Sequence, residues 1–385
     1  MLVGHLSDTH LGAAEYNLRE REEDVYEAFE EAAQIMIKDH VDLVIHAGDI
    51  FDVPKPSGTA IVKLVNQLKE LKQHGIPFFF TLGEHDISRL REVPVPFLYP
   101  KVGLATYVGD GRPVRHDGLT IVGFHKRRKT EMEELQAKLK SLCSELAGAS
   151  GKKILVLHQA LLEFHKWAGE MTSSDLPQCF DYYAMGHLHD NFERRFDGLG
   201  GPVCYPGSID ATGSEGIREF KKGFYIVDLS GDEAHPQWVE LKSLRRQLAP
   251  ELDFERLEEM IEGLVEEIKG LPKKPLLNLR VRGRDIDSVK VANAIKPLQP
   301  YSLYTVWEPL EEGSALGKEY HGRPSDIDQE MLELADRVTG SRERAEFAVK
   351  ELLPLVAEGR TDEATELLWS LFTSGKLLDQ EAEKR

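Results

Sequence analysis

The chain has 385 residues, of which 41% are hydrophobic and 30% charged, so it is long enough for two or three domains and has an ordinary globular composition. Asp and Glu number 66 against 48 Lys and Arg, and the formal charge of −18 lacks the basic character of many nucleic-acid-binding proteins. Any contact with a polyanion would therefore depend on local basic patches.

The cysteines and the amino-terminal segment indicate in which cellular compartment the protein is expected. Cys143, Cys179 and Cys204 are scattered without a Cys-x-x-Cys pair, which predicts neither a disulfide framework nor a thiolate metal site. The opening MLVGHLSDTHLG lacks the basic and apolar regions of a signal peptide, and no run of about 18 apolar residues predicts a membrane-spanning helix. We expect a cytoplasmic protein without a membrane partner.

Apolar runs alternate with amphipathic stretches over roughly the first 245 residues, a pattern typical of α/β layers. The predicted strands are Leu2–Leu6, Asp42–His46, Pro77–Leu82, Thr120–Phe124, Lys153–His158, Tyr182–Met185, Val203–Tyr205 and Phe224–Val227. The predicted helices are Glu22–Asp39, Thr59–Gln73 and Thr130–Leu146. In the first of these helices, Val25, Ala28, Phe29, Ala32 and Ala33 form one apolar stripe that should pack on a sheet.

A second domain is expected after a boundary near residue 248. A helix over Asp253–Lys269, a strand over Leu276–Arg284, a helix over Ile286–Ile295 and a strand over Tyr301–Val306 predict a small α+β unit. In its first strand, Leu277, Leu279 and Val281 alternate with Asn278, Arg280 and Arg282, which places apolar groups on one face and polar groups on the other.

The last part of the chain reads as a polar linker followed by helices. Thr361 is a plausible N-cap, and Ala364, Leu367, Leu368, Leu371 and Phe372 recur at helical spacing. Phe347, Glu351, Leu352 and Val356 suggest a shorter stripe upstream. The stripe of Leu367, Leu368, Leu371 and Phe372 predicts a docking site for a partner, and the alternative is a helical hairpin packed on the main domain.

Short motifs rich in carboxylate and imidazole occur in order at or near strand ends. They are Asp8-Thr9-His10, Gly48-Asp49, Gly83-Glu84-His85-Asp86, His158-Gln159 and Gly186-His187-Leu188-His189. Each alone is weak, because an Asp-x-His pair is commonly a cap and a surface histidine, and Gly-Asp is a common turn. The ordered set is much more specific: loops converge at the carboxyl ends of strands, and this mixed oxygen and nitrogen donor set suits Mn, Fe or Zn. Together the motifs predict a dinuclear metal centre.

These motifs resemble those of the calcineurin-like metallophosphoesterases, D-x-H, G-D, G-N-H-[D/E], H and G-H-x-H. Within that superfamily the chain is similar to the double-strand-break repair nucleases of the meiotic-recombination-eleven (SbcD) type. The resemblance implies a two-sheet α/β sandwich flanked by helices over 1–247, a DNA-binding α+β cap over 248–310, a linker over 311–326 and a helical ATPase-binding segment over 327–385. It also implies two divalent ions, Mn²⁺ being expected.

The resemblance assigns roles residue by residue. Asp8, His10, Asp49 and His189 are expected to hold one ion, and Asp49, Glu84, His158 and His187 the other, with Asp49 bridging. His85 is expected to act as a catalytic acid beside the phosphate, with its imidazole oriented by Asp86.

Two positions depart from the family pattern. Glu84 stands where the family has Asn, so an ionised side chain lowers the formal charge of the two ions and their carboxylates from about +2 to about +1, which should tighten metal binding and reduce Lewis acidity. Asp52 stands where many relatives have a histidine after Gly-Asp-x-Phe, so that histidine's role is not available here.

Local basic clusters are candidate DNA contacts. Lys126, Arg127, Arg128 and Lys129 follow a strand directly, and Arg280 and Arg282 lie in the α+β unit. Arg194-Arg195, Lys221-Lys222 and Arg245-Arg246 add further patches. Taken alone, each such run is usually a solvated surface, but beside a phosphodiesterase centre it could hold phosphates near the metals.

We therefore expect a metal-dependent DNA exonuclease and endonuclease, with 3'–5' polarity, that processes double-strand breaks as a homodimer together with a coiled-coil ABC-type ATPase. One alternative is a phosphoesterase of another substrate on the same fold. Arginines that clamp a phosphomonoester just after Gly-Asp are lacking in Ile50–Lys55, which favours a diester. The other alternative is a largely non-catalytic DNA-binding scaffold in which Glu84 has blunted the chemistry.

Overall fold

The computed structural model describes residues 1–88, 92–166 and 169–311, and beyond them 332, 335, 336, 341–353, 365 and 367–369. The chain divides into two units, Met1–Gly313 and Ser314–Arg385, which are considered separately.

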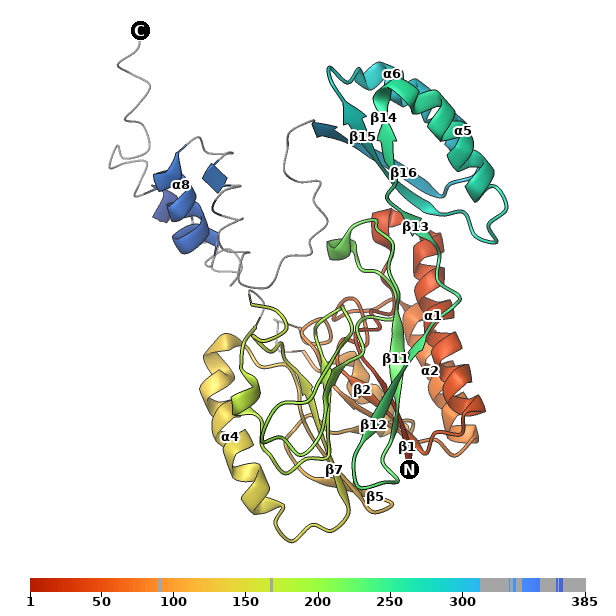
Figure 1. Ribbon diagram of the computed structural model, residues 1–385. Helices are drawn as coiled ribbons and strands as arrows, with labels where there is room; N and C mark the ends of the chain where they lie inside the picture. Colours follow the sequence, from red (N-terminus) through yellow and green to blue (C-terminus); the bar gives the residue numbers. More distant parts are fainter. Residues whose placement is uncertain are drawn as a thin grey trace. The chain divides into compact units, whose positions relative to one another are not determined.

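Two mixed six-stranded sheets form the main part of the first unit (Figure 1). The first sheet has the order β12 (His235–Glu240), β11 (Gly223–Asp228), β1 (Leu2–Leu6), β2 (Leu43–Ala47), β3 (Phe78–Thr81), β4 (Thr106–Tyr107). The second has the order β5 (Val114–His116), β6 (Leu119–Phe124), β7 (Lys152–His158), β8 (Tyr182–Gly186), β10 (Val203–Tyr205), β9 (Phe192–Arg194). The strands β1, β2 and β3 are parallel to one another, as are β6, β7 and β8, so within each group the carboxyl ends lie at one edge.

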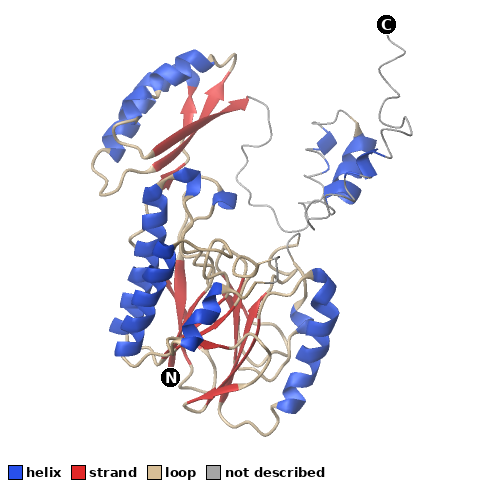
Figure 2. Ribbon diagram, turned by 180° about the vertical axis from the view of Figure 1, so that it is seen from behind, coloured by secondary structure: helices blue, strands red, loops and turns tan. Residues whose placement is uncertain are grey.

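The sheets pack face to face through an apolar layer. Val3 and Ile45 of the first sheet share a buried cluster with Ile121, Val156 and Ala184 of the second. The outer face of the first sheet is covered by α1 (Arg19–Lys38) and α2 (Gly58–Gln73), and that of the second by α4 (Met132–Glu145), as Figure 2 shows from behind. The central strands are therefore buried on both faces, which is why they read as continuous apolar runs. The predicted sandwich of two sheets flanked by helices is confirmed.

The apolar stripe predicted for the first helix is buried. Val25, Ala28, Phe29, Ala32 and Ala33 are at most 4% exposed, in agreement with the prediction. The helix begins at Arg19, three residues before the predicted start at Glu22, and the residue before it, Leu18, is extended (φ −100°, ψ 121°).

The small α+β unit predicted after residue 248 lies within the first of the two units, Met1–Gly313. It has a parallel four-stranded sheet covered by α5 (Leu257–Ile268) and α6 (Ser288–Ala294). Its strands are β13 (Gln247–Leu248), β14 (Glu251–Asp253), β15 (Leu276–Gly283) and β16 (Tyr304–Glu311). The predicted alternation along β15 is confirmed, since Leu277, Leu279 and Val281 are fully buried and Arg282 is exposed.

Two element boundaries in this unit differ from prediction. The last strand starts at Tyr304 rather than at Tyr301, because the N–H groups of Tyr301 and Ser302 donate to Leu298 O in a turn. The second helix starts at Ser288 rather than at Ile286, because the Asp287 carboxylate caps it by accepting from the N–H groups of Val289 and Lys290.

The prediction that the cysteines form no disulfide is wrong: Cys143 and Cys179 form a disulfide, and only Cys204 is free. The pair is separated by 36 residues and carries no recognisable spacing. It forms because Cys143 on α4 packs beside the segment that leads into β8.

The predicted helical segment is described only in part. In the helix α8 (Arg342–Phe347) and the turn that follows, Ala345 and Val349 are buried, whereas Phe347 and Leu352 of the predicted stripe are half-buried. Leu367 and Leu368 lie in a helical stretch, while Val356, Thr361, Ala364, Leu371 and Phe372 lie outside the described residues. No helix among the described residues is both long and apolar enough to cross a membrane.

Candidate metal centre

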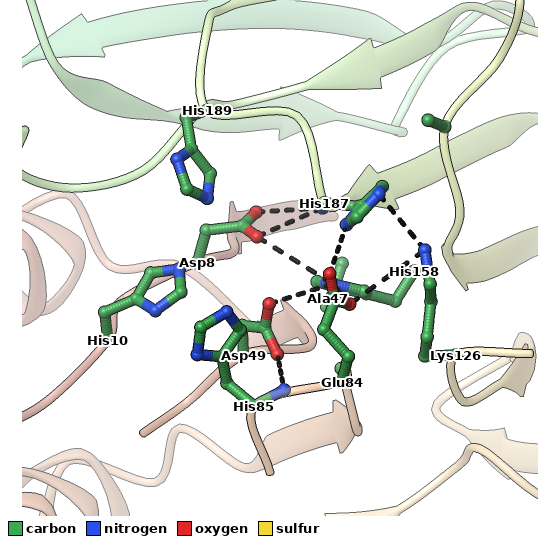
Figure 3. Close-up of polar contacts among 12 residues, drawn as sticks. Asp8, His10, Ala47, Asp49, Glu84, His85, Lys126, His158, His187 and His189 are labelled. Carbon is green, nitrogen blue, oxygen red and sulfur yellow. Dashed lines mark hydrogen bonds and ion pairs between the residues drawn. The ribbon is translucent and has the colours of Figure 1, made fainter. Parts of the chain in front are cut away.

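The structure brings all seven predicted metal ligands and His85 together at the edge where the carboxyl ends of the parallel strands meet (Figure 3). Asp8 follows β1, Asp49 follows β2, and Glu84 follows β3 in the first sheet. In the second sheet, His158 ends β7 and His187 follows β8. Loops from both sheets therefore supply one site.

Unusual backbone conformations direct these side chains inward. The φ angles of Asp8, His10, Asp49 and His187 are 52°, 44°, 54° and 90°, all in the left-handed region that residues other than glycine rarely adopt. Such residues cluster at functional sites, where the surrounding structure must offset a cost of about 1–3 kcal/mol each. Gly83 is required by space, since a Cβ there would lie 2.1 Å from Asp49 Oδ1.

The ligands form two overlapping groups. Asp8, His10 and His189 make one group in which each residue offers a ligand atom within 4.8 Å of the others, and Glu84, His158 and His187 make another. In the second group, Glu84 Oε2 lies 3.0 Å from His158 Nε2, and Glu84 Oε1 lies 2.8 Å from His187 Nδ1.

Asp49 connects the two groups. Its Oδ2 lies 3.2 Å from His158 Nε2, and Asp49 and His158 form a further candidate ligand group with Asp8. The other oxygen, Oδ1, accepts the backbone N–H of His85 at 2.8 Å. This position between the groups is the one that a bridging carboxylate requires.

Hydrogen bonds orient the imidazole of His158. Its Nδ1 donates to Ala47 O at 2.7 Å, which turns Nε2 toward the carboxylates. His10 is 3% exposed, and its Nε2 makes no hydrogen bond to a described residue. Buried nitrogen atoms without hydrogen-bond partners are costly unless something else satisfies them, and a metal ion would do so.

The electrostatics also favour a cation. Burial raises the pKa of Asp8. Burial acts against a charged His158, yet the carboxylates of Asp49 and Glu84 raise the pKa of this imidazole well above 6.5. For His10, burial is likewise outweighed by Asp52 and the other carboxylates, and the pKa is raised to about 9. Without a metal ion, the buried carboxylates favour protonated imidazoles, because a positive charge offsets their own. A divalent ion would supply that positive charge instead, and the set of oxygen and nitrogen donors fits Mn²⁺, Fe²⁺ or Zn²⁺.

Glu84 points into the cluster. Burial opposes its ionisation, but contacts with His158 and His187 hold the pKa of the Glu84 carboxyl below its usual range. Lys126 lies beside it: its Nζ is 4.0 Å from Glu84 Oε2, 3.1 Å from His187 Nε2 and 2.7 Å from Glu170 Oε1. Lys126 was predicted as a DNA contact within a surface run, whereas its side chain is 11% exposed and forms part of the wall of the site.

His85 is oriented differently from the prediction. Its Nδ1 lies 2.6 Å from Asp52 O and donates to that carbonyl. Asp86 accepts instead from the backbone N–H groups of Ile50, Phe51 and Gly83 at 3.0–3.2 Å. The expectation that Asp86 orients the His85 imidazole is therefore wrong: this carboxylate ties the loops after β2 and β3 together.

Asp52 contributes its side chain elsewhere. Its Oδ1 lies 3.5 Å from His10 Nδ1, so the residue that replaces the family histidine faces a predicted ligand. A carboxylate on the remote nitrogen of a metal-binding histidine is a common orienting arrangement.

Sequence reasoning missed Thr212 and Glu215. Thr212 Oγ1 lies 2.9 Å from His189 Nδ1, and Glu215 forms a capping box with Thr212. The T-x-x-E spacing of Thr212-Gly-Ser-Glu215 is a recognisable capping-box signal, but only the fold brings it to the metal ligands.

The remaining predicted DNA contacts lie in two places. Arg128 and Lys129 are exposed after β6, and the N–H of Arg127 donates to Gln159 Oε1 at 2.6 Å. On β15, Arg280 and Arg282 both contact Glu251 of β14, at 3.5 and 2.6 Å.

Comparisons with known proteins agree with this geometry. Residues 1–191 match the family described as calcineurin-like phosphoesterase. The chain is similar to proteins named "DNA double-strand break repair protein Mre11". The one from Sulfolobus acidocaldarius is 32% identical, with 79% of this chain and 82% of the relative covered. The one from Thermoplasma acidophilum is 34% identical, with 72% and 76% covered. The one from Archaeoglobus fulgidus is 30% identical, with 100% and 88% covered.

Proposed function

The chain belongs to the Mre11 family of DNA double-strand break repair proteins, and we propose that it processes broken DNA ends as a 3'–5' exonuclease and an endonuclease. The observation that carries this function is the meeting of seven carboxylate and imidazole side chains at one site, with Asp49 between the two groups that they form. A metal-dependent phosphodiesterase is the activity that this arrangement and this family support.

The proposed ligand sets are Asp8, His10, Asp49 and His189 for one ion, and Asp49, Glu84, His158 and His187 for the other. When bound, two divalent ions neutralise charge on the phosphate and lower the pKa of the attacking water. We propose Mn²⁺ as the physiological ion, because it accepts both carboxylate and imidazole ligands.

His85 is the proposed acid for the leaving sugar oxygen. Its Nδ1–H is held by the carbonyl of Asp52, so Nε2 is the atom left to carry a transferable proton. Its backbone N–H is held by Asp49, which fixes the residue beside the proposed bridging ligand. Held by two hydrogen bonds, the imidazole can deliver a proton with little reorganisation.

The exposed basic residues Arg128 and Lys129 extend from the edge of the site, and we propose that they hold the DNA backbone. Arg280 and Arg282 are proposed as further contacts from the α+β unit. An acidic protein needs such local cations to retain a polyanion.

An end-labelled DNA duplex with Mn²⁺ tests the nuclease function. We expect the native chain to shorten the strand from its 3' end, and Asp49→Asn to abolish cleavage. The matched control is Asp39→Asn, because Asp39 is an exposed carboxylate at the end of α1. Cleavage by Asp49→Asn at the native rate would contradict the proposal.

The alternatives give different outcomes in the same experiment. A phosphoesterase of another substrate would hydrolyse a small phosphate monoester or diester in preference to DNA. A scaffold would bind DNA without cleaving it, and Glu84 is the feature that favours this candidate, since its charge should reduce Lewis acidity.

We also propose that the helical segment binds a coiled-coil ABC-type ATPase through Leu367, Leu368, Leu371 and Phe372. Of these, Leu368 is 42% exposed, and the neighbouring Trp369 is 66% exposed. Burying each such side chain is worth about 1.5–3 kcal/mol, so four could anchor a complex. Deleting residues 326–385 should abolish co-purification with the ATPase while leaving Mn²⁺-dependent nuclease activity intact. Loss of folding or of metal in the truncated chain would contradict this assignment.

A homodimer is the proposed assembly of the first unit. Val62 on α2 and Leu98 and Val102 at α3 (Leu98–Lys101) are apolar and 46–57% exposed. Sedimentation of the native chain against Val62→Lys tests this proposal, and an unchanged mass of the variant would argue against this surface.

A further inference from the structure

The segment that follows β10 contains none of the predicted metal-binding motifs, yet one of its side chains contacts His189. Thr212 Oγ1 lies 2.9 Å from His189 Nδ1. The same hydroxyl lies 3.2 Å from Glu215 Oε2, which also accepts the backbone N–H of Thr212 at 2.8 Å. A hydroxyl group therefore lies between a carboxylate and a predicted metal ligand.

The chemistry of these groups gives the hydrogen bonds a direction. An ionised carboxylate only accepts, so the Thr212 hydroxyl donates its proton to Glu215. The lone pairs of Oγ1 then accept from His189 Nδ1–H. This pattern leaves the lone pair of His189 on Nε2, where it can bind a metal ion.

Lys222 fixes the far end of this chain of contacts. Its ammonium is 2% exposed and donates to Glu215 Oε1 at 2.6 Å. It also donates to His189 O at 2.9 Å, and the N–H of Ser208 donates to the same carbonyl at 3.1 Å. The backbone of His189 is thus held independently of Thr212, whose hydroxyl acts on the ring.

We propose that Thr212 is a positioning residue that holds the His189 imidazole with Nδ1 protonated and Nε2 free, and that Glu215 and Lys222 hold Thr212 in turn. The inference rests on the proposed role of His189 as a metal ligand. Partners of this kind set the tautomer and ring orientation of metal-binding histidines, and their removal typically costs about 10- to 100-fold in metal affinity.

A second capping box in the chain provides a matched control. Thr172 donates its N–H to Asp175 Oδ2 at 2.8 Å and its hydroxyl to the same oxygen at 3.0 Å. This arrangement repeats that of Thr212 and Glu215 but involves none of the predicted ligands. The variant Thr172→Val therefore measures what the loss of a capping-box hydroxyl does to folding alone.

The test compares Thr212→Val, Thr212→Ser, Thr172→Val and His189→Ala as full-length, metal-free proteins titrated with Mn²⁺ by calorimetry. Valine has nearly the shape of threonine and suits the extended backbone of Thr212 (φ −99°, ψ 160°). We expect Thr212→Val to weaken the binding of one Mn²⁺ ion by about 10- to 100-fold. Thr212→Ser keeps the hydroxyl and should retain native affinity, as should Thr172→Val.

Long-range ¹H–¹⁵N correlation spectra of histidine-labelled protein give a readout that is independent of metal binding. In the native metal-free protein, His189 should show protonated Nδ1 and unprotonated Nε2. In Thr212→Val it should show a mixture of the two tautomers, and in Thr212→Ser the native pattern.

The outcomes separate the inference from the function on which it rests. If His189→Ala binds both Mn²⁺ ions with native affinity, His189 is no ligand and the proposed metal centre is wrong. If His189→Ala loses an ion while Thr212→Val binds both ions normally with native His189 spectra, only the positioning role is refuted. If Thr212→Ser is as weak as Thr212→Val, the hydroxyl is not what matters, and the inference is also refuted.

Discussion

Replacing the buried Arg21 should destabilise the first unit strongly. Its guanidinium is fully buried on α1 and contacts three carboxylates: Nη1 lies 2.7 Å from Asp24 Oδ2, and Nη2 lies 2.9 Å from Asp210 Oδ2 and 3.4 Å from Glu15 Oε2. Asp210 lies in the segment that carries Thr212, so this cluster joins α1 to the loop beside His189.

The loss of stability in Arg21→Met depends on which carboxylates lose their cationic partner. In Arg21→Met, Asp24 keeps Arg245 at 2.6 Å and Lys273 at 3.1 Å. Asp210, which is 3% exposed, loses its cationic partner. Breaking a buried pair on one side costs about 3–5 kcal/mol. At roughly 2–4 °C per kcal/mol, the range for domains of about 150–250 residues, the melting temperature should fall by up to roughly 6–20 °C.

The pH dependence has a definite sign. Burial raises the pKa of Asp210 above 3.8 even with Arg21 present. A carboxyl whose pKa is higher in the folded than in the unfolded state binds more protons when folded, so its contribution to stability improves as the pH falls toward 3.8. Arg21 lowers this pKa, so in Arg21→Met the pKa of Asp210 rises further and the variant gains more stability than the native chain as the pH falls. The stability difference between Arg21→Met and the native chain should therefore shrink from pH 7 to pH 5.

Thermal unfolding followed by fluorescence measures the effect, with Arg19→Met as the control on the same helix. The Arg19 side chain is 86% exposed and pairs with Glu23 at 3.1 Å, an exposed pair worth about 0.3–0.5 kcal/mol. Adding Asp210→Asn to Arg21→Met should recover part of the loss. A melting temperature for Arg21→Met equal to that of Arg19→Met would refute the reasoning.

Three further predictions concern the site and the disulfide. His85→Ala should keep both Mn²⁺ ions by calorimetry and lower DNA turnover by about 10²- to 10⁴-fold. The control His74→Ala, at an exposed histidine, should change neither quantity, and loss of metal from His85→Ala would mean that His85 is a ligand. Glu84→Asn should weaken Mn²⁺ binding or raise turnover because it removes a negative charge from the ligand set, and unchanged values of both would show that Glu84 does not bind metal. The Cys143–Cys179 bond closes a loop of 36 residues, so its reduction should lower the free energy of unfolding by about 4 kcal/mol, measured by urea titration. An unchanged urea midpoint would mean that the bond does not form in solution.

The sequence predicts much of the site because its motifs sit where buried strands end. The strand ending at Leu6 is an apolar run followed at once by Ser7 and Asp8, and His158 closes another such run. Parallel pairing aligns the end of β1 with that of β2 and the end of β7 with that of β8, and the packing of the two sheets brings both groups to one site. The contacts that the sequence does not reveal are those between segments distant along the chain. Thr212 meets His189 only through the packing of the segment after β10, and neighbouring sequence positions gave no reason to prefer Asp52 over Asp86 as the partner of His85.

The pairing of strands also limits what a local pattern can show. The sequence predicts a strand from Tyr301, yet Tyr301 and Ser302 form part of a turn. At its other end the strand continues to Glu311, because it pairs with β15 along the whole length of β15. The disulfide has the same origin, since α4 and the segment before β8 meet only in the folded chain.

The central claim, a dinuclear centre bridged by Asp49, is tested most directly by a crystal structure of the Mn²⁺-loaded protein with anomalous diffraction measured at the manganese edge. We predict two anomalous peaks, with Asp49 contacting both ions, Asp8, His10 and His189 on one, and Glu84, His158 and His187 on the other. A single peak, or two peaks that share no carboxylate of Asp49, would contradict the account.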